Sequence, residues 1–192
     1  HRVKNNLQVV SSLLSMQARA IQNEQAVQAL RECEGRVWSM ACIHDHLHRS
    51  ESLAAIDMEQ YVKELAGSLI GLYGASAIEV AVDAPGVKLA LDKAIPCGLI
   101  LNELVTNCLK HAFPAGRSGQ IDIVLRRREG RCELRISDNG VGLVAGLDVE
   151  EPTTLGLTLV NILTTQLKGR LELEGDRGTA VNLSFAVGGS ES

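Results

Sequence analysis

The strongest constraint on the fold lies in the first 50 residues, where apolar side chains recur at alternating spacings of four and three. That spacing places them on one narrow stripe of a helix, and the pattern occurs twice, on either side of Asn23. Asn23 can end the first helix and cap the second, and the short link at Asn23–Glu24 forces the helices to run antiparallel. The sequence therefore predicts a helical hairpin. Its stripes comprise Val3, Leu7, Val10, Leu14, Ala18 and Ile21, then Ala26, Leu30, Cys33, Val37, Met40, His44 and Leu47.

Stripes this narrow cannot bury a hairpin by themselves, so a four-helix bundle formed by two copies of the chain is the natural completion. The pattern begins at His1 without an initiator Met, which predicts that the chain is a piece of a longer protein. No apolar run reaches about 18 residues, so neither a transmembrane helix nor a signal peptide is expected.

From Met58 onwards the pattern changes to segments that alternate in polarity, separated by turn residues such as Ala84-Pro85-Gly86 and Glu129-Gly130. Strands that pair as hairpins beside segregated helices predict an α+β sandwich with a mixed, mainly antiparallel sheet. Asp92 is expected to cap the long central helix. The expected helices are 58–73, 92–112 and 155–167, and the expected strands are 78–82, 87–91, 120–128, 131–137, 170–175 and 179–187.

Charge and cysteine content exclude several classes of protein. The formal net charge of -4 argues against a nucleic-acid binder, whose footprint would be a basic patch. The five cysteines are odd in number and form no Cys-x-x-Cys pair, which argues against a zinc site or a disulfide framework. Each is interpreted as a small apolar side chain in a reducing compartment, so we expect a cytoplasmic chain that makes no membrane contact of its own.

A polar stripe interrupts the otherwise apolar central helix. Glu103, Asn107, Lys110 and His111 stand at positions i, i+4, i+7 and i+8, which share one helical face. Such a helix has one side for the core and one for a ligand. The plainer interpretation is a solvated face.

Three glycine-containing segments follow. Asp138-Asn139-Gly140-Val141-Gly142 comes after a strand, where a carboxylate can accept a hydrogen bond from an amino group and glycines admit a flat ligand. In Thr154-Leu155-Gly156-Leu157 a loop opens into a helix, whose first N–H groups can bind phosphate. Gly178-Thr179 leads into the last strand. Each segment alone could be an ordinary turn.

In this order the segments resemble the ATP-binding domain shared by histidine kinases, DNA gyrase, Hsp90 and MutL, over about residues 57–188. The resemblance implies that Asp138 accepts the adenine amino group, that Gly140 and Gly142 lie beside adenine, and that Thr179 supports Asp138. It further implies that residues 143–154 form a lid over ATP, although Thr154 stands where many members carry glycine. The remaining implied roles are water or nucleophile orientation by Glu103, a Mg²⁺ ligand at Asn107, and phosphate contacts at Lys110, His111, Gly156 and Leu157.

The hairpin selects among the functions of that superfamily. His1-Arg2-Val3-Lys4-Asn5-Asn6 resembles the phosphoacceptor box of the "HRxKNN" histidine kinases, which are related to the HWE kinases. An imidazole is substantially neutral at pH 7 and can attack phosphorus. The resemblance implies a sensor histidine kinase core: MgATP phosphorylates His1, and the phosphoryl group passes to an aspartate in the receiver domain of a response regulator. Arg2 follows His1 where larger families carry an acidic residue, so the general base stays open.

These inferences predict a phosphoacceptor hairpin over 1–56, an ATP-binding domain over 57–188 and a tail over 189–192, in a homodimer. Two alternatives remain. One is an ATPase or protein serine kinase of the same superfamily, which would lack the His1 hairpin. The other is a phosphotransfer or scaffold protein with a degenerate nucleotide domain, which the intact set of Glu103, Asn107 and Asp138 disfavours.

Overall fold

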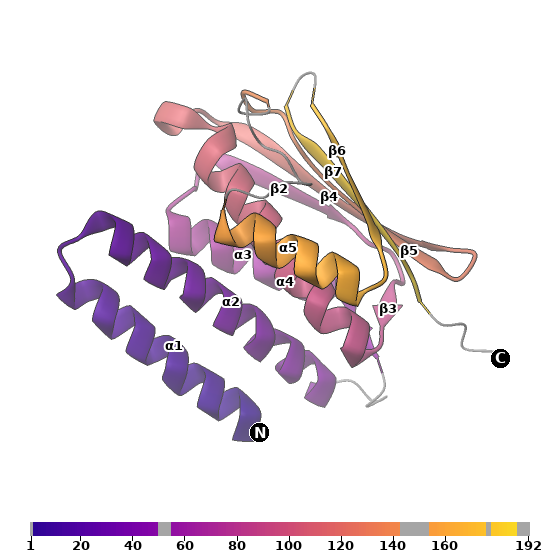
Figure 1. Ribbon diagram of the computed structural model, residues 1–192, viewed down its shortest axis with the longest axis horizontal. Coiled ribbons are helices and arrows are strands. Elements are labelled where there is room, and N and C mark those ends of the chain that lie inside the picture. Colours follow the sequence, from indigo (N-terminus) through magenta and orange to yellow (C-terminus); the bar gives the residue numbers. More distant parts are fainter. Residues whose placement is uncertain (1, 50–54, 143–153, 176–177, 188–192) are drawn as a thin grey trace.

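The protein is arranged in three layers: a sheet, a layer of helices packed on one of its faces, and a helical hairpin beyond them (Figure 1). The computed structural model describes residues 2–49, 55–142, 154–175 and 178–187. Within these ranges no helix is both long enough and apolar enough to cross a membrane. The α+β class predicted from the sequence is confirmed.

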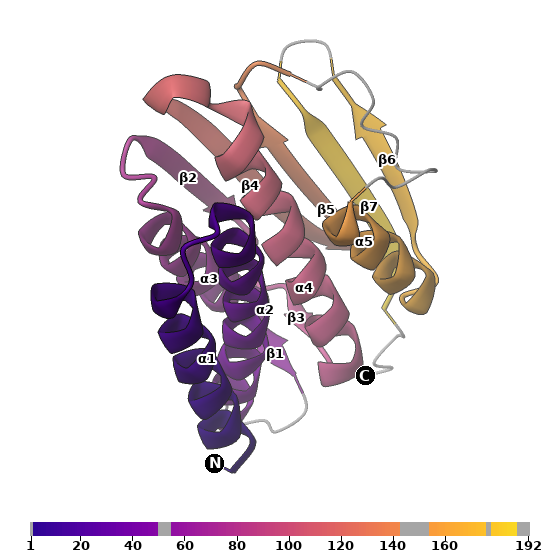
Figure 2. The ribbon, with the colours of Figure 1, turned by 60° about the vertical axis from the view of Figure 1, so that its left-hand side comes forward.

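The outer layer is the antiparallel hairpin of α1 (Arg2–Ala20) and α2 (Glu24–Arg49), seen side by side in Figure 2. Asn23 caps α2 as predicted, since its Oδ1 accepts a hydrogen bond from the Ala26 N–H at 3.0 Å. The link is slightly longer than expected, because Glu24 already belongs to α2 and residues 21–23 form the connection. Only α2 packs broadly on the rest of the molecule, so α1 forms the free edge of the structure.

The main sheet has five strands in the order β2-β4-β5-β7-β6. The pair β2 and β4 is parallel and all the other neighbours are antiparallel, which gives the mixed, mainly antiparallel sheet that the sequence predicted. Glu129 and Gly130 both have positive φ, 50° and 73°, as the tight turn between β4 and β5 requires. The strands are β2 (Ile78–Asp83), β4 (Gly119–Arg128), β5 (Arg131–Asp138), β6 (Arg170–Glu174) and β7 (Ala180–Ala186).

A second, two-stranded sheet was not predicted. Residues 87–91 were expected to form a full strand, but only β3 (Lys88–Leu89) is extended, and it pairs antiparallel with β1 (Ile56–Asp57). Ile56 and Leu89 face each other in this ribbon and both are buried. The ribbon therefore anchors the point at which the chain enters the sandwich.

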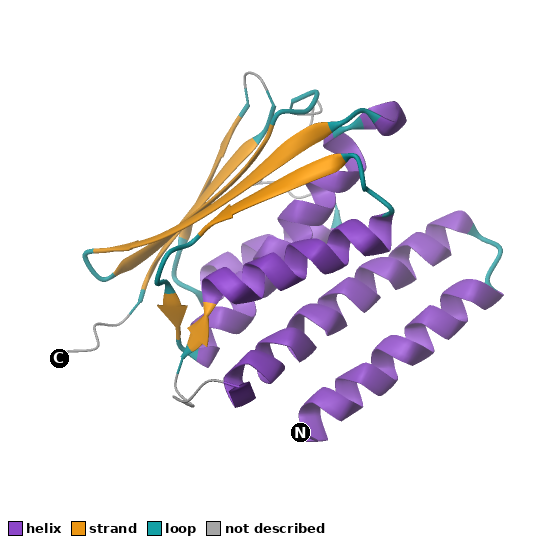
Figure 3. Ribbon diagram, turned by 180° about the vertical axis from the view of Figure 1, so that it is seen from behind, coloured by secondary structure: helices purple, strands orange, loops and turns teal. Residues whose placement is uncertain are grey.

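The middle layer contains α3 (Met58–Tyr73), α4 (Leu91–Asn107) and α5 (Leu155–Gln166), which lie together on one face of the sheet (Figure 3). Their buried leucine, isoleucine and valine side chains meet the inward side chains of the strands in one core. Asp57 caps α3, because its Oδ1 accepts from the N–H of Glu59 at 3.0 Å and of Gln60 at 3.3 Å.

The central helix departs from the sequence prediction at both ends. Its N-cap is Ala90, whose side chain cannot accept a hydrogen bond, so the prediction that Asp92 caps the helix is wrong; Asp92 lies in the first turn. At its other end α4 passes into a five-residue π-helix, Cys108–Ala112, instead of continuing as α-helix to residue 112. Phe113 then leaves the helical region at φ -126°, as expected of a residue that precedes proline.

The hairpin and the sandwich are in close contact through α2 and α4. A Cβ at Gly35 of α2 would lie 3.1 Å from the Asn102 Oδ1 of α4, so the two helix backbones approach each other closely there. One turn along α2, the buried Ser39 Oγ lies 2.6 Å from the Tyr61 hydroxyl of α3. The outer hairpin is therefore packed directly against the helix that carries the predicted polar stripe.

Candidate functional site

Asp138 is a buried carboxylate fixed at the end of β5. Its side chain is 8% exposed, and its Oδ1 accepts hydrogen bonds from the N–H of Gly140 at 2.9 Å and of Thr179 at 3.3 Å. Its own N–H donates to the Thr179 carbonyl at 2.9 Å. The Cys108 thiol donates weakly to Oδ2, with a sulfur–oxygen distance of 3.6 Å. Oδ2 therefore retains acceptor capacity for an amino group of a ligand.

The segment after Asp138 is packed tightly against the π-helix. The Val141 N–H donates to the Ala112 carbonyl at 3.0 Å, and a side chain at Gly140 would overlap that same carbonyl. Gly142 has φ 85°, in the left-handed region that favours glycine, and lies beside Gly178. The glycines thus let two backbone segments approach closely around Asp138.

Burial raises the pKa of the Cys108 thiol, and the neighbouring Asp138 charge raises it further. Cys108 therefore stays protonated at neutral pH and acts as a donor to Asp138. Sequence reasoning assigned Cys108 no role beyond packing.

Glu103 lies one turn before the end of α4 and is 4% exposed. Its two oxygens accept hydrogen bonds from Arg36 of α2, Nε to Oε1 at 2.8 Å and Nη2 to Oε2 at 2.8 Å. The Asn102 side-chain amide donates a further hydrogen bond to Oε1 at 3.0 Å. The hydrogen bond to Glu103 raises the pKa of the Arg36 guanidinium above its already high value. Arg36 and Glu103 thus form a two-pronged and largely buried ion pair.

The π-helix changes the shared face that the sequence predicted. Glu103 and Asn107 stand one turn apart on α4, but Lys110 and His111 follow in a wider turn, so the i+7 and i+8 spacing no longer aligns them with Glu103. Asn107 and Lys110 are half-buried, whereas His111 is exposed. Partial loss of hydration and the Lys110 charge lower the pKa of His111, so its imidazole is neutral at pH 7.

Two residues of the hairpin complete the site, and sequence reasoning missed both. Lys110 forms an ion pair with Glu32, and Arg36, which binds Glu103, lies 3.9 Å from the same Glu32 carboxylate. These four alternating charges, Glu103, Arg36, Glu32 and Lys110, are called the charge chain below. Glu32 and Arg36 are four residues apart on α2 and lie outside its apolar stripe. From the sequence alone, such a pair suggests only a solvated ion pair on the helix surface.

The start of α5 lies beside the charge chain. A Cβ added to Gly156 would lie 2.7 Å from the Glu103 Oε2, so only glycine fits comfortably at this position. Thr154 is the N-cap, and its Oγ1 accepts a hydrogen bond from the N–H of the buried Leu157 at 3.3 Å. Thr154, which stands where many family members carry glycine, therefore caps α5. Its hydrogen bond also occupies the Leu157 N–H, which was expected to be available to phosphate.

The arrangement fits a nucleotide in part. Asp138 presents an anchored acceptor for an amino group, and glycines line its surroundings. Asn107 supplies a neutral oxygen, and Mg²⁺ commonly takes few protein ligands and completes its shell with water and phosphate. The lid expected over 143–154 lies outside the described residues except for Thr154, and so does His1.

The position of α1 places its first residues far from Glu103. Ser15 of α1 donates a hydrogen bond to Glu34, which lies between Glu32 and Arg36 on α2. Arg2 precedes Ser15 by about 13 residues, which at about 1.5 Å per residue is about 20 Å along the helix. The beginning of the hairpin is therefore about 20 Å along its axis from the level of the charge chain.

Comparisons with known proteins match two families to two successive parts of the chain. A family described as "Histidine kinase" matches residues 1–73. A second family, described as "Histidine kinase-, DNA gyrase B-, and HSP90-like ATPase", matches residues 92–188. The N-terminal match covers the hairpin and α3, and the second covers α4, the site and most of the sheet.

Two relatives are similar over almost the whole chain. "Sensor histidine kinase PdtaS" of Mycobacterium tuberculosis is 35% identical over 201 residues, covering 98% of this chain and 38% of that protein. "Blue-light-activated histidine kinase 2" of Erythrobacter litoralis is 26% identical over 196 residues, covering 97% of this chain and 55% of that protein. The chain thus spans between about two fifths and about half of the length of these relatives.

Among solved structures, the histidine kinase domain of the Erythrobacter litoralis EL346 blue-light activated histidine kinase superposes with a TM-score of 0.73 at 23% identity. The match covers 93% of this chain and 95% of that domain. At this level of identity the likeness establishes the fold: helical hairpin, sandwich and their order along the chain.

Proposed function

This chain belongs to the histidine kinases, with an ATPase domain of the family that they share with DNA gyrase B and HSP90, and on that premise we propose that it phosphorylates His1 with MgATP. The phosphoryl group would then pass to an aspartate in the receiver domain of a response regulator. We place this reaction in the cytoplasm, because ATP, the proposed phosphoryl donor, is available there.

The observation that carries the proposal is the direct contact between the hairpin and the polar stripe of α4. Arg36 of the hairpin binds the buried Glu103 through two hydrogen bonds of 2.8 Å, and Glu32 binds Lys110. An ATPase or serine kinase of the same superfamily needs no such hairpin. Transfer to histidine requires the phosphoacceptor hairpin to dock on the ATP-binding domain, and α2 of this hairpin makes that contact.

We propose the following roles for the site residues. Asp138 accepts the adenine amino group at Oδ2 while Gly140 and Thr179 fix its other oxygen, and Gly142 keeps the backbone close to the ring. The N-terminus of α5 at Gly156 and Leu157 would face phosphate, and the Leu157 N–H would have to leave its hydrogen bond to Thr154 to take part. Asn107 is the Mg²⁺ ligand, and Lys110 and the neutral His111 contact phosphate oxygens.

The chemical step would be an in-line displacement at the γ-phosphorus. The lone pair of a neutral His1 nitrogen forms the new P–N bond, the bond from the γ-phosphorus to the bridging oxygen breaks, and ADP leaves with that electron pair. The Glu103 carboxylate would orient the His1 imidazole by accepting a hydrogen bond from the N–H of the ring nitrogen that does not attack. Catalysis would consist mainly of positioning and charge neutralisation.

The described arrangement fits a resting state of such an enzyme. Arg36 neutralises Glu103, and the start of α1 lies about 20 Å along the hairpin axis from that level. Transfer would therefore require the sandwich to move along the hairpin, with the charge chain broken, or a histidine from a second chain.

A homodimer would also cover the free side of α1. Val9 is 59% exposed, Val10 42%, Leu13 54% and Met16 64%, which is a continuous apolar face on one helix. Packing a second hairpin against it would complete the four-helix bundle that the heptad spacing predicts.

Two experiments test the nucleotide site and the dimer. In a calorimetric titration, Asp138→Asn should weaken ADP binding at least tenfold, because an amide can present a donor where an acceptor is needed. The exposed Asp92→Asn is the matched control and should bind as wild type does. Equal ADP affinity in both variants would remove Asp138 from the adenine site.

To test transfer within a dimer, a His1→Ala chain and an Asn107→Ala chain, both extended upstream of His1, are mixed and incubated with labelled ATP. Transfer between chains predicts label on the Asn107→Ala chain alone. A mixture that stays unlabelled, while wild type labels, would contradict transfer between chains.

A further inference from the structure

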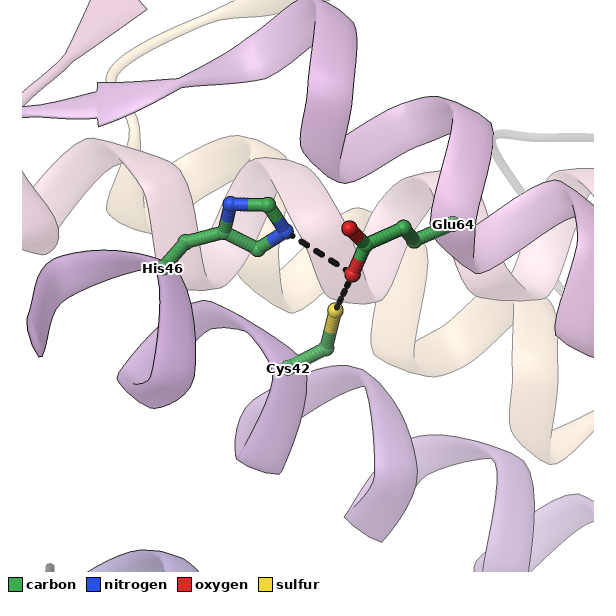
Figure 4. Close-up of side chains that lie close together, drawn as sticks. All are labelled: Cys42, His46 and Glu64. Atoms are coloured by element: carbon green, nitrogen blue, oxygen red, sulfur yellow. Dashed lines mark hydrogen bonds and ion pairs between the residues drawn. The ribbon is translucent and has the colours of Figure 1, made fainter. Parts of the chain in front are cut away.

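A second constellation of chemistry-bearing side chains lies between α2 and α3, on the opposite side of Ser39 from the charge chain. Cys42 and His46 are one turn apart on α2, and Glu64 reaches them from α3 (Figure 4). The His46 Nε2 is 3.1 Å and the Cys42 Sγ is 3.6 Å from the same oxygen, Glu64 Oε2. All three atoms lie within 4.8 Å of one another.

Two of these separations are close to those of ligands around one metal ion. Zinc bonds of about 2.3 Å to sulfur and about 2.0–2.2 Å to nitrogen or oxygen place neighbouring ligand atoms of a tetrahedron about 3.3–3.7 Å apart. Two of the three distances already match that edge length within a few tenths of an ångström. The side chains could therefore turn from hydrogen bonding one another to binding one ion without a shift of the helices.

The surroundings orient the three ligands as the outer shell of a metal site does. The Gln60 side-chain amide donates a hydrogen bond of 2.9 Å to Glu64 Oε1, which leaves Oε2 directed at Cys42 and His46. The His46 ring stands edge-on to Tyr61, with centroids 6.1 Å apart. Cys42 and His46 are buried, whereas the Glu64 side chain is 35% exposed and gives access from solvent.

Charge balance identifies the class of ion. A thiolate and a carboxylate carry two negative charges, and a neutral imidazole adds none, so a divalent cation yields a neutral site that suits a buried position. Thiolate and imidazole select zinc-like transition metals over Mg²⁺, which prefers oxygen ligands. Binding releases the Cys42 thiol proton to solvent, and water can fill the fourth position.

We propose that Cys42, His46 and Glu64 bind Zn²⁺ or a similar divalent transition metal and so cross-link the hairpin to the sandwich. The sequence argument against zinc considered only the number and spacing of the cysteines, and it could not detect a carboxylate that α3 supplies from 22 residues away. The site is separate from the proposed Mg²⁺ position at Asn107, and the argument for it does not rest on the kinase proposal. A bound metal ion would hold α2 and α3 together.

The test uses chelator-treated protein without nucleotide, titrated with Co²⁺ and then with Zn²⁺. We expect one Co²⁺ per chain, with a thiolate-to-cobalt band in the near ultraviolet, and displacement by Zn²⁺. Cys42→Ser should abolish the band and weaken Zn²⁺ binding at least tenfold. Cys33→Ser, the same change on the same helix, is the control and should leave both unchanged.

Glu64→Gln provides a second variant at a partly exposed position, where loss of folding is not a concern. It should also weaken Zn²⁺ binding at least tenfold, with an unchanged circular dichroism spectrum. The proposal is overturned if the wild type shows no thiolate band, or if the band and the Zn²⁺ affinity survive Cys42→Ser. In that case the three side chains form only a hydrogen-bonded contact between helices.

Discussion

Removing Arg36 should reveal how strongly the hairpin and the sandwich are coupled. The Glu103 side chain is 6% exposed and its two hydrogen bonds to Arg36 are both 2.8 Å, so Arg36→Met would leave a buried carboxylate without its counter-charge. Breaking a buried pair by removing one partner costs about 3–5 kcal/mol. The Asn102 amide still donates to Glu103, which favours the lower end of this range, about 3 kcal/mol.

A double variant separates the effect of the unpaired charge from that of its surroundings. Replacing both members by apolar residues, Arg36→Met with Glu103→Leu, removes the unpaired charge, so the double variant should lose far less stability than Arg36→Met alone. Lys63→Met is the control for an exposed pair, because Lys63 and Glu59 are spaced i, i+4 on the surface of α3. That change should cost no more than about 0.5 kcal/mol.

The free energy of unfolding is measured for each variant by urea titration at pH 7, followed by circular dichroism. A loss below about 1 kcal/mol in Arg36→Met would mean that the pair is not buried as described. A double variant as unstable as Arg36→Met would show that the cost comes from lost packing of the arginine stem and not from the charge.

Two further changes test other parts of the site. Gly140→Ala should lower the free energy of unfolding by about 1–3 kcal/mol and weaken ADP binding, because its methyl group would overlap the Ala112 carbonyl. Gly67→Ala, in open space on α3, should instead raise the free energy of unfolding by about 0.4–1 kcal/mol in the same urea assay. Burial alone would raise the pKa of Glu32, but the hydrogen bond and charge of Lys110 outweigh it and lower that pKa. Glu32 therefore stabilises the fold above its unfolded pKa of about 4.3, and the stability difference between wild type and Glu32→Gln should close as the pH falls below about 4; a constant difference would contradict the ion pair.

Much of the fold could be predicted because its signals are local. The 4-3 spacing specified the hairpin, Asn23 specified its cap, and Glu129-Gly130 specified the turn that sets the register of β4 and β5. The position of Asp138 at a strand end followed from the strand pattern before it, whereas its link to Thr179 was implied only by the family resemblance. In the structure the Asp138 N–H donates to the Thr179 carbonyl, and the Thr179 N–H donates to the Asp138 Oδ1.

The features that sequence reasoning missed depend on contacts between distant parts of the chain. Arg36 meets Glu103 across 67 residues, and a charged residue off an apolar stripe gives no sign of such a partner. The π-helix after Asn107 is another case, because apolar periodicity does not distinguish a wide turn from an α-helical one. Asp92 was a plausible cap by residue type, but the helix begins one residue before it.

The site roles and module boundaries stay predictions for a related reason. The boundary near residue 56 falls beside the β1–β3 ribbon, which depends on pairing between segments about 30 residues apart and leaves no local signature. His1 and most of the expected lid lie outside the described residues, so their roles depend on the family and on the chemistry of histidine.

The most direct test of the central claim is the chemical identity of a self-attached phosphoryl group. The protein, extended upstream of His1 by several helical turns, is incubated with labelled ATP and Mg²⁺, and the label is tested for stability in acid and in alkali. The account predicts a label that is lost in acid, survives alkali and maps to His1, and that disappears in His1→Ala although ADP still binds. An extended protein that binds ATP but never carries label on His1 would contradict the account.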